Sequence, residues 1–259
     1  MPPQSTFRNI GLARALSKLG YCSRSKAVEL IRTGHVCLNG NVRRDPETPV
    51  HLERDRIVVD GQEIKREEYV YLMMNKRRGV VTTASDEKGR ETVYSVLAKA
   101  HEASNLSRPR GSWLAPVGRL DKASEGLLLL TNDSEWSAHV TAPATHVTKT
   151  YHVQIARVVD ESFAQGLVAG VHDENEILRA KQASVLRTGE KNCWLEIVLE
   201  EGKNRQIRRM LEALDIEVLR LIRIAIGPLE LGKLAKGAVR ALSDDEKQSL
   251  DRAMQPKQS

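Results

Sequence analysis

The four consecutive leucines Leu127–Leu130 constrain the fold more than any other part of the chain. Gly126 precedes them and Asn132 follows shortly after, and a short apolar run between such residues is typical of a buried strand. A polar turn comes directly before this strand, and we expect it to lie at the edge of a sheet. Its Arg119 and Asp121 are two residues apart, so extended backbone directs both side chains to the same side. Alone, these residues predict either a structural ion pair or a functional carboxylate.

The composition narrows the class of protein. The 259 residues suffice for one large or two modest domains, and 41% hydrophobic residues suffice for a packed core. The net charge of +6 favours an anionic partner such as nucleic acid. The three cysteines show no Cys-x-x-Cys spacing, which indicates free thiols and a reducing cytoplasm. The sequence has no apolar run of membrane-spanning length, no phosphate-binding glycine loop and no metal-spaced His cluster, so we expect no membrane partner, cofactor or metal.

Residues 8–66 are predicted to form a small separate module. Apolar residues at helical spacing predict one helix over 10–19 and a second helix capped by Ser23 or Ser25. Asn39-Gly40 between short apolar runs predicts a strand, a tight turn and a second strand. Helices of this size carrying basic residues are found in many compact modules.

Three strings in this module resemble the alpha-L RNA-binding motif, which is named after small-subunit ribosomal protein number four. They are Leu19–Ala27, Ile31–Val36 and Leu38–Gly40. The resemblance implies contact with RNA, and it gives as candidate phosphate contacts Arg14, Lys18, Ser23, Arg24, Lys26 and Arg32. Each of these residues alone is typical of a solvated surface, whereas the cluster favours RNA.

A charged linker over 63–69 is predicted to lead into a second domain of residues 69–245, followed by a polar tail of residues 246–259. Strands are expected over 70–76, 80–83, 147–153, 194–199 and 218–227, and helices over 92–100 and 161–169. A polar, basic loop is expected over 101–113. Many strands with few long helices predict an α+β fold rather than a doubly wound sheet.

The string Gly118-Arg119-Leu120-Asp121, followed by Gly126-Leu127-Leu128 and Thr131-Asn132-Asp133, closely resembles the signature of the ribosomal RNA pseudouridine synthases. It is most similar to the small-subunit/large-subunit branch of that family. The resemblance implies that Asp121 is the essential catalytic residue. It also implies a mixed, largely antiparallel sheet with the active-site cleft across it.

Two further strings follow in the order that the resemblance requires. In Lys149-Thr150-Tyr151, the resemblance places Tyr151 against the target base, although a Tyr in a strand is more often part of the core. Leu221 corresponds to an apolar residue that packs on the uracil ring, and here too a plain core role is the alternative. The turn Lys76–Gly79 also resembles the family, but Arg77 stands where Pro is usual, and this departure is expected to loosen the turn.

The segment 200–211 carries several basic residues before and along a predicted helix. The resemblance implies that one of them pairs with Asp121; by position this is Lys203, with Arg205 as the second choice. The helix is predicted to turn its apolar residues inward, and these are Ile207, Met210, Leu211 and Leu214. Its opposite side would gather three arginines that suit phosphate binding or an ordinary charged surface, namely Arg205, Arg208 and Arg209.

The resemblance as a whole implies an RNA pseudouridine synthase, an isomerase that flips a uridine out of its stack and needs no cofactor. Asp121 would act as a nucleophile or as a base on the sugar, while Arg119 would hold the space that the flipped nucleotide leaves. The strings Asn204–Met210 and Arg220–Arg223 favour large-subunit rRNA over small-subunit rRNA. We expect a monomer whose partner is ribosomal RNA or a ribosomal-subunit precursor. A catalytically inactive RNA-binding assembly protein and a carboxylate-based hydrolase are the alternatives from other classes.

Overall fold

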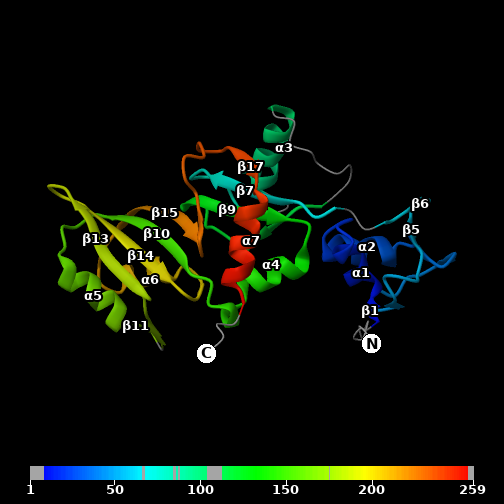
Figure 1. Ribbon diagram of the computed structural model, residues 1–259, viewed down its shortest axis with the longest axis horizontal. Helices are drawn as coiled ribbons and strands as arrows, with labels where there is room; N and C mark the ends of the chain where they lie inside the picture. Colours follow the sequence, from blue (N-terminus) through cyan, green and yellow to red (C-terminus); the bar gives the residue numbers. More distant parts are fainter. Residues whose placement is uncertain are drawn as a thin grey trace. The chain divides into compact units, whose positions relative to one another are not determined.

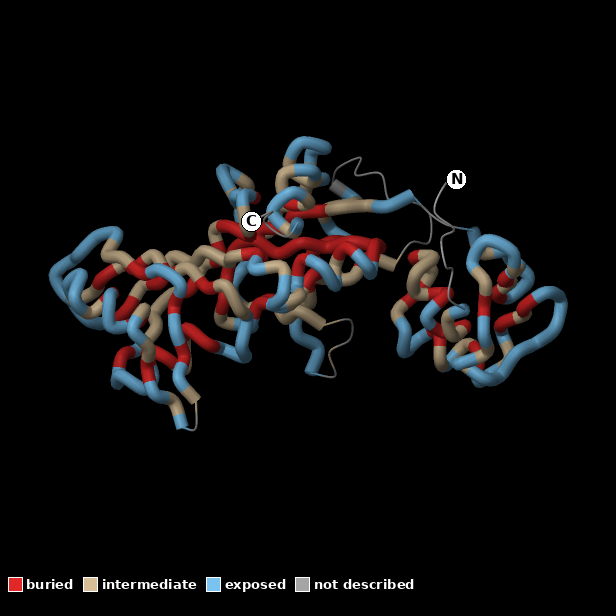
Figure 2. Tube along the Cα trace, turned by 60° about the horizontal axis from the view of Figure 1, so that its bottom comes forward, coloured by how far each residue is buried: buried red, intermediate tan, exposed pale blue. Residues whose placement is uncertain are grey.

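The structure, a computed structural model, describes residues 9–65, 68–83, 86, 88–103, 113–174 and 176–255. These residues form two compact units, each with its own buried core (Figures 1 and 2). The first unit contains the described residues up to Val70 together with 113–115 and 131–136. The second unit contains the remaining described residues. Two short pieces of the later sequence therefore fold with the N-terminal module, which the contiguous prediction of 8–66 did not include.

Within its described residues up to Val70, the first unit has two helices and six short strands. The helices are α1 (Leu12–Lys18) and α2 (Arg24–Arg32). The strands are β1 (Ile10–Gly11), β2 (Val36–Leu38), β3 (Asn41–Val42), β4 (Pro49–Val50), β5 (Ile57–Val59) and β6 (Gln62–Glu63). Four of them form a sheet in the order β3-β2-β5-β6, and β1 pairs with β4.

Local chemistry explains the ends of these elements. The hydroxyl of Ser23 accepts a hydrogen bond from the backbone N–H of Lys26 and so caps α2, as predicted. Asn39 and Gly40 have φ angles of 53° and 83°, as a type I′ hairpin turn requires. The first helix begins later than predicted, because Ile10 pairs with β4.

Figure 1 labels most of the helices and strands that follow Val70. The strands are β7 (Tyr71–Lys76), β8 (Ala115–Val117), β9 (Glu125–Thr131), β10 (Lys149–Ile155), β11 (Val171–Asp173), β12 (Glu176–Leu178), β13 (Gln182–Thr188), β14 (Cys193–Leu199), β15 (Val218–Ile226), β16 (Leu229–Glu230) and β17 (Val239–Ala241). The helices are α3 (Val93–Ala103), α4 (Ser134–Thr141), the 3-10 helix η1 (Pro143–Thr145), α5 (Glu161–Ala169), α6 (Gln206–Glu212) and α7 (Asp244–Ala253). Every helix within the described residues is too short or too polar to span a bilayer.

One mixed sheet organises these elements. Within the described residues it has nine strands in the order β13-β14-β10-β15-β9-β7-β17, with β16 on β15 and β8 on β9. The pair β15–β9 is parallel, whereas β13–β14, β14–β10, β10–β15 and β17–β7 are antiparallel. The fold is therefore α+β with a mixed, largely antiparallel sheet, as the sequence predicted.

Strand β9 is buried along its whole length. Leu127–Leu130 are each 0% exposed (Figure 2). At Gly126 the neighbouring strand β15 comes very close: a Cβ atom there would lie 2.2 Å from the carbonyl oxygen of Arg223. Only glycine permits this approach.

Three local predictions are corrected by the structure. Residues 80–83 do not form a ladder strand, and only an isolated bridge joins Val81 to Thr92. The segment 246–253, predicted as part of a polar tail, belongs to α7, because a capping box of Ser243 and Glu246 stabilises the start of this helix and Leu250 is fully buried. The expected inward position of Leu214 is wrong, because α6 ends before it and its side chain is 37% exposed.

The loop predicted over 101–113 is replaced at its start by the last turn of α3. Residues 104–112 lie outside the described residues.

Candidate active site

Asp121 lies on a turn whose backbone is held by hydrogen bonds from several directions. Five successive carbonyl oxygens of this turn, from Leu120 to Ser124, each accept a hydrogen bond. The donors are the hydroxyl of Thr82 to Leu120 (2.8 Å), the N–H of Ser124 to Asp121 (3.0 Å), the N–H of Gly79 to Lys122 (2.8 Å), Nη2 of Arg208 to Ala123 (3.2 Å) and Nζ of Lys76 to Ser124 (2.8 Å). A carboxylate on such a turn is positioned before any substrate arrives.

Lys76 is the most unusual donor to this turn. It is the last residue of β7 and is only 1% exposed. Burial lowers its pKa to about 8, although the nearby carboxylates of Asp121 and Glu125 oppose the shift. Its ammonium group donates to the carbonyl oxygens of Ser124 and Arg77, so this lysine joins β7 to the turn that carries Asp121.

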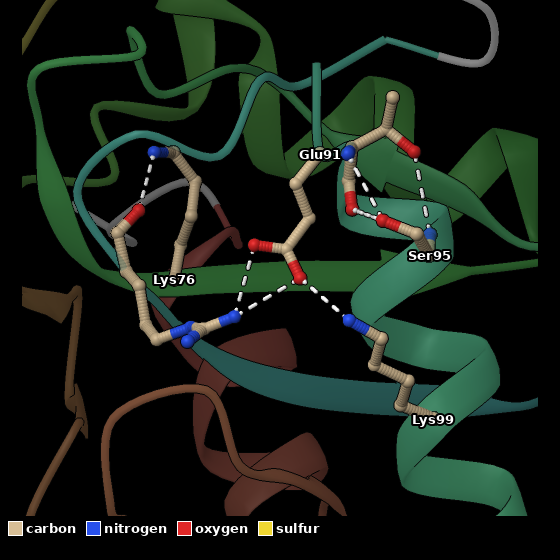
Figure 3. A network of polar contacts seen from close by, with 6 residues as sticks. Lys76, Glu91, Ser95 and Lys99 are labelled. Atoms are coloured by element: carbon tan, nitrogen blue, oxygen red, sulfur yellow. Dashed lines mark hydrogen bonds and ion pairs between the residues drawn. The ribbon is translucent and has the colours of Figure 1, made fainter. Parts of the chain in front are cut away.

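Arg77, which stands where the resemblance expects proline, belongs to an ion-pair network with Glu91 and Lys99, both labelled in Figure 3. Its guanidinium Nη2 donates to both carboxylate oxygens of Glu91, at 3.0 and 2.9 Å. Nζ of Lys99 donates to the same carboxylate at 3.1 Å. The expectation of a looser turn is therefore not met, because side-chain contacts from the segment around α3 restrain it in place of the proline ring.

Asp121 forms an ion pair with Arg205. Its Nη1 lies 3.7 Å from Oδ2 of Asp121, and both side chains are accessible, at 49% and 42% exposed. Arg205 precedes α6 and adopts a left-handed backbone conformation with φ of 50°. A residue with a side chain rarely takes this conformation, and such strain is often found at functional sites.

The predicted pairing of Lys203 with Asp121 is corrected by the structure. Nζ of Lys203 lies 3.0 Å from Glu176 and 3.5 Å from Glu201, and the hydrogen bond to Glu176 raises its pKa. Two acidic neighbours thus bind the ammonium group, so Arg205, the second choice, pairs with Asp121 instead.

The three arginines predicted to gather on one face of α6 do not do so. Arg209 forms ion pairs with Asp173 and Glu176, away from the cavity around Asp121. Arg208 is partly buried and contacts the turn at Ala123, and burial lowers its pKa. The prediction of a shared phosphate-binding face is therefore wrong for Arg209.

A cavity of about 610 Å³ opens beside Asp121. Among the described residues, its lining includes six cations and two carboxylates. The cations are Arg119, Lys149, Lys203, Arg205, Arg208 and Arg223, and the carboxylates are Asp121 and Glu201. This excess of positive charge suits an anionic ligand such as a nucleotide.

The two residues expected to hold the base also line this cavity. Tyr151 lies on β10, and Leu221 lies on the adjacent strand β15. Leu221 is 6% exposed and belongs to the hydrophobic core, so it forms part of the core and of the cavity wall together. The sheet thus provides an aromatic ring and an apolar wall on one side of the cavity.

A second hollow of about 500 Å³ adjoins the first. Both hollows are lined by Arg119, Asp121 and Arg205, and Lys122 and Thr82 line the second. Asp121 therefore lies where a deeper cavity meets a shallower one, and an extended polymer can pass over it.

The candidate RNA contacts of the first unit differ in their surroundings. Lys18 pairs with Glu135, Lys26 lies 2.8 Å from Glu29 and Arg24 lies 3.9 Å from Glu47. The side chain of Ser23 is used as a helix cap. Arg14 and Arg32 are exposed and have no carboxylate within 4 Å among the described residues.

Sequence reasoning missed three residues at the site: Lys76, Lys149 and Arg223. The last two could have been found from strand periodicity. Lys149 lies two residues before Tyr151, and Arg223 two residues after Leu221, so each shares a sheet face with a residue that the resemblance had assigned to the base. Burial of Lys76 carries no comparable signal in the sequence.

Comparison with known proteins agrees with this geometry. The sequence profile of a family described as RNA pseudouridylate synthase matches residues 70–213, and an S4 domain profile matches residues 10–57. The chain belongs to the RNA pseudouridylate synthase family. It is therefore an RNA pseudouridine synthase with an N-terminal S4 domain, and RNA is its partner.

Individual relatives resemble the synthase over nearly its whole length. An uncharacterized RNA pseudouridine synthase of Aquifex aeolicus (strain VF5) is 33% identical over 246 residues, which is 95% of each chain. The ribosomal large subunit pseudouridine synthase B of Bacillus subtilis (strain 168) is 33% identical and covers 91% of this chain and 93% of its own. A crystal structure of a pseudouridylate synthase is 30% identical with a TM-score of 0.62, over 93% of this chain and 99% of the other.

Proposed function

We propose that this synthase isomerises a specific uridine of ribosomal RNA and that Asp121 is its catalytic residue. The observation that carries the proposal is the position of this carboxylate. It is accessible, faces Arg205, lies at the junction of two hollows and is held on a turn whose carbonyl oxygens are all hydrogen-bonded. A carboxylate needed only for structure has no reason to lie at the mouth of a basic cavity.

The cavity fits a nucleotide that has left its helical stack. Tyr151 would stack on the uracil, Leu221 would pack against it and Arg119 would occupy part of the space that the nucleotide leaves. Arg205 orients the carboxylate of Asp121 toward the ribose. No group is added to or lost from the RNA, so the proposed reaction needs no group donor.

Two roles of Asp121 fit the same position. As a nucleophile it attacks ribose carbon C1′ while the bond to uracil N1 breaks. As a base it removes the proton on C2′ while the same bond breaks. Deuterium at C2′ of the target uridine separates them, since only the second role predicts a primary kinetic isotope effect.

We propose large-subunit rRNA, or its precursor particle, as the substrate. The Bacillus subtilis relative named for the large subunit supports this choice, as do the strings Asn204–Met210 and Arg220–Arg223. Small-subunit rRNA is the alternative. We propose a monomer, and the three free cysteines suit a reducing cytoplasm.

Mapping pseudouridines in rRNA from cells with and without the gene tests this proposal. We expect one modified position, or a small set, to disappear from large-subunit rRNA in the deletion strain. The purified protein should restore it on unmodified transcripts. Loss of a pseudouridine from small-subunit rRNA would identify that rRNA as the substrate instead. Unchanged pseudouridine maps of both rRNAs would contradict the assignment to ribosomal RNA.

A further inference from the structure

The lining of the cavity includes two cations, Lys149 and Arg223, to which the proposed function gives no role. They lie on the adjacent strands β10 and β15 (Figure 1). Arg223 is the cross-strand partner of Tyr151, and Leu221 is that of Val153. Because side chains alternate along a strand, Lys149 shares a face with Tyr151, and Arg223 shares it with Leu221. Both cations therefore border the place where we propose that the base lies.

Arg223 is buried but only partly bonded. It is 5% exposed, and its Nε donates to the carbonyl oxygen of Leu127 at 2.7 Å. Its Nη2 is buried and has no hydrogen-bond partner among the described residues. An unpaired N–H on a buried charged group is costly, and a ligand that accepts from it removes that cost.

Lys149 lacks a close carboxylate as well. No carboxylate lies within 4 Å of its ammonium group in the part of the chain that the structure describes. Burial lowers the pKa of Lys149, and the positive charge of Arg223 lowers it further, whereas the carboxylate of Glu200 opposes the shift. Glu200 itself is held by Lys181 at 2.7 Å. Two cations thus act on each other at one end of the cavity, and an acceptor between them would relieve the repulsion.

We propose that Lys149 and Arg223 bind a carbonyl oxygen of the flipped uracil and stabilise the negative charge that forms on the base when its glycosidic bond breaks. This inference rests on the proposed function. When the bond between C1′ and N1 breaks, its electron pair leaves with the uracil, and the charge spreads over the ring and its two oxygens. The pair at C5 then bonds to C1′, and the proton on C5 is lost while N1 gains one. Charge on the oxygens is largest between these two steps.

Burial favours the base over a backbone phosphate as the ligand of this pair. A side chain that is 5% exposed can meet only a group that enters the cavity, and the base is the part of the nucleotide that enters it. The phosphates stay outside, where Arg119 and Lys122 are exposed at the mouth. Preformed donors directed at developing charge lower a barrier more than donors that must first reorganise.

Lys149→Met tests the proposal, with Lys191→Met in the exposed turn between β13 and β14 as the matched control. Initial steady-state rates are measured over a range of concentrations of an rRNA transcript on which the wild-type enzyme forms pseudouridine. We expect kcat to fall about 10-fold to 100-fold with KM little changed. The control should keep the wild-type rate, and Lys149→Arg should recover most of the loss.

A transcript with 5-fluorouridine at the target position provides the second readout. Fluorine replaces the hydrogen that C5 must lose, so no pseudouridine forms, and cleavage of the bond between N1 and C1′ is followed as the loss of 5-fluorouridine. The fluorine withdraws electrons and makes the uracil a better leaving group, so the defect of Lys149→Met in bond cleavage should become smaller. A purely structural role of Lys149 would slow both substrates equally and would overturn the proposal. A rise in KM with kcat unchanged would also overturn it, because the pair would then bind a phosphate. Absence of turnover by the wild-type enzyme would instead contradict the proposed function itself.

Discussion

The cations of the first unit and those of the cavity are arranged in opposite ways. In the first unit they are mostly accessible, and several have an acidic neighbour, as Lys26 has in Glu29. In the cavity, Arg208, Lys149 and Arg223 are partly or largely buried and have no carboxylate within 4 Å among the described residues. Exposed charge attracts a polyanion over a distance and is screened by salt, whereas buried charge acts on one group at one place. If the proposed roles hold, the same residue types serve RNA affinity in the first unit and chemistry in the cavity.

The largest effect should follow from Asp121→Asn, which keeps the shape of the side chain and removes its charge. We expect turnover to fall by at least about 10³-fold, because neither nucleophilic attack nor proton removal is then possible. RNA affinity, measured by filter binding, should stay within about twofold of wild type. Substantial turnover by this variant would mean that another group carries the reaction.

A smaller loss is expected when the cation beside Asp121 is removed. Arg205→Met should lower kcat about 100-fold, because the carboxylate loses the group that orients it. Lys203→Met is the matched comparison and should cost only a few-fold, since Glu176 and Glu201 already engage that ammonium group. If Lys203→Met were the more damaging change, the partner expected from the sequence would be the functional one.

In the first unit, changes should affect binding and not the chemical step. The double variant Arg14→Gln/Arg32→Gln removes two exposed charges without carboxylate partners. We expect Kd to rise about tenfold at 0.1 M salt and the slope of log K against log salt to become shallower by about 1 to 2, with kcat at saturating RNA unchanged. Lys26→Gln, whose charge is already paired with Glu29, should have the smaller effect. Equal losses from both variants would mean that ion pairing within the unit does not decide which cations bind RNA.

The smallest effect should come from Ser23→Ala, because Ser23 serves as a helix cap. Loss of the cap should lower the free energy of unfolding of the first unit by about 0.5–2 kcal/mol. Urea unfolding followed by circular dichroism measures this change. Weaker RNA binding at a temperature where the unit is fully folded would show that the hydroxyl contacts RNA as well.

Much of the fold follows from local patterns in the sequence. The leucines of β9, the Asn39-Gly40 turn and the span of α5 could be predicted because adjacent residues determine them. The α+β class followed from the number of strands. Strand propensity failed at 80–83 because hydrogen bonds to more distant residues, such as that of Thr82 with Leu120, direct this segment toward the turn of Asp121.

The sequence predicted several residues that line the cavity, but it predicted the ion pairs between them less well. Asp121, Tyr151 and Leu221 line the cavity, which the order of the motifs had suggested. The choice between Lys203 and Arg205 depends on where Glu176 lies, 27 residues earlier in the chain, and no spacing rule predicts that distance. The role of Lys76 likewise depends on which carbonyl groups its buried ammonium can reach.

Gly126 lies between the turn that carries Asp121 and the strand that carries Arg223. It lies at the start of β9, and a Cβ atom there would meet the backbone of β15. A methyl group at this position would clash with Arg223 and force the backbones of β9 and β15 apart. Asp121 would then move away from Lys149 and Arg223, although every side chain of the proposed site remained in the sequence. The absence of a Cβ atom at Gly126 thus sets the distance between Asp121 and the strand that carries Arg223.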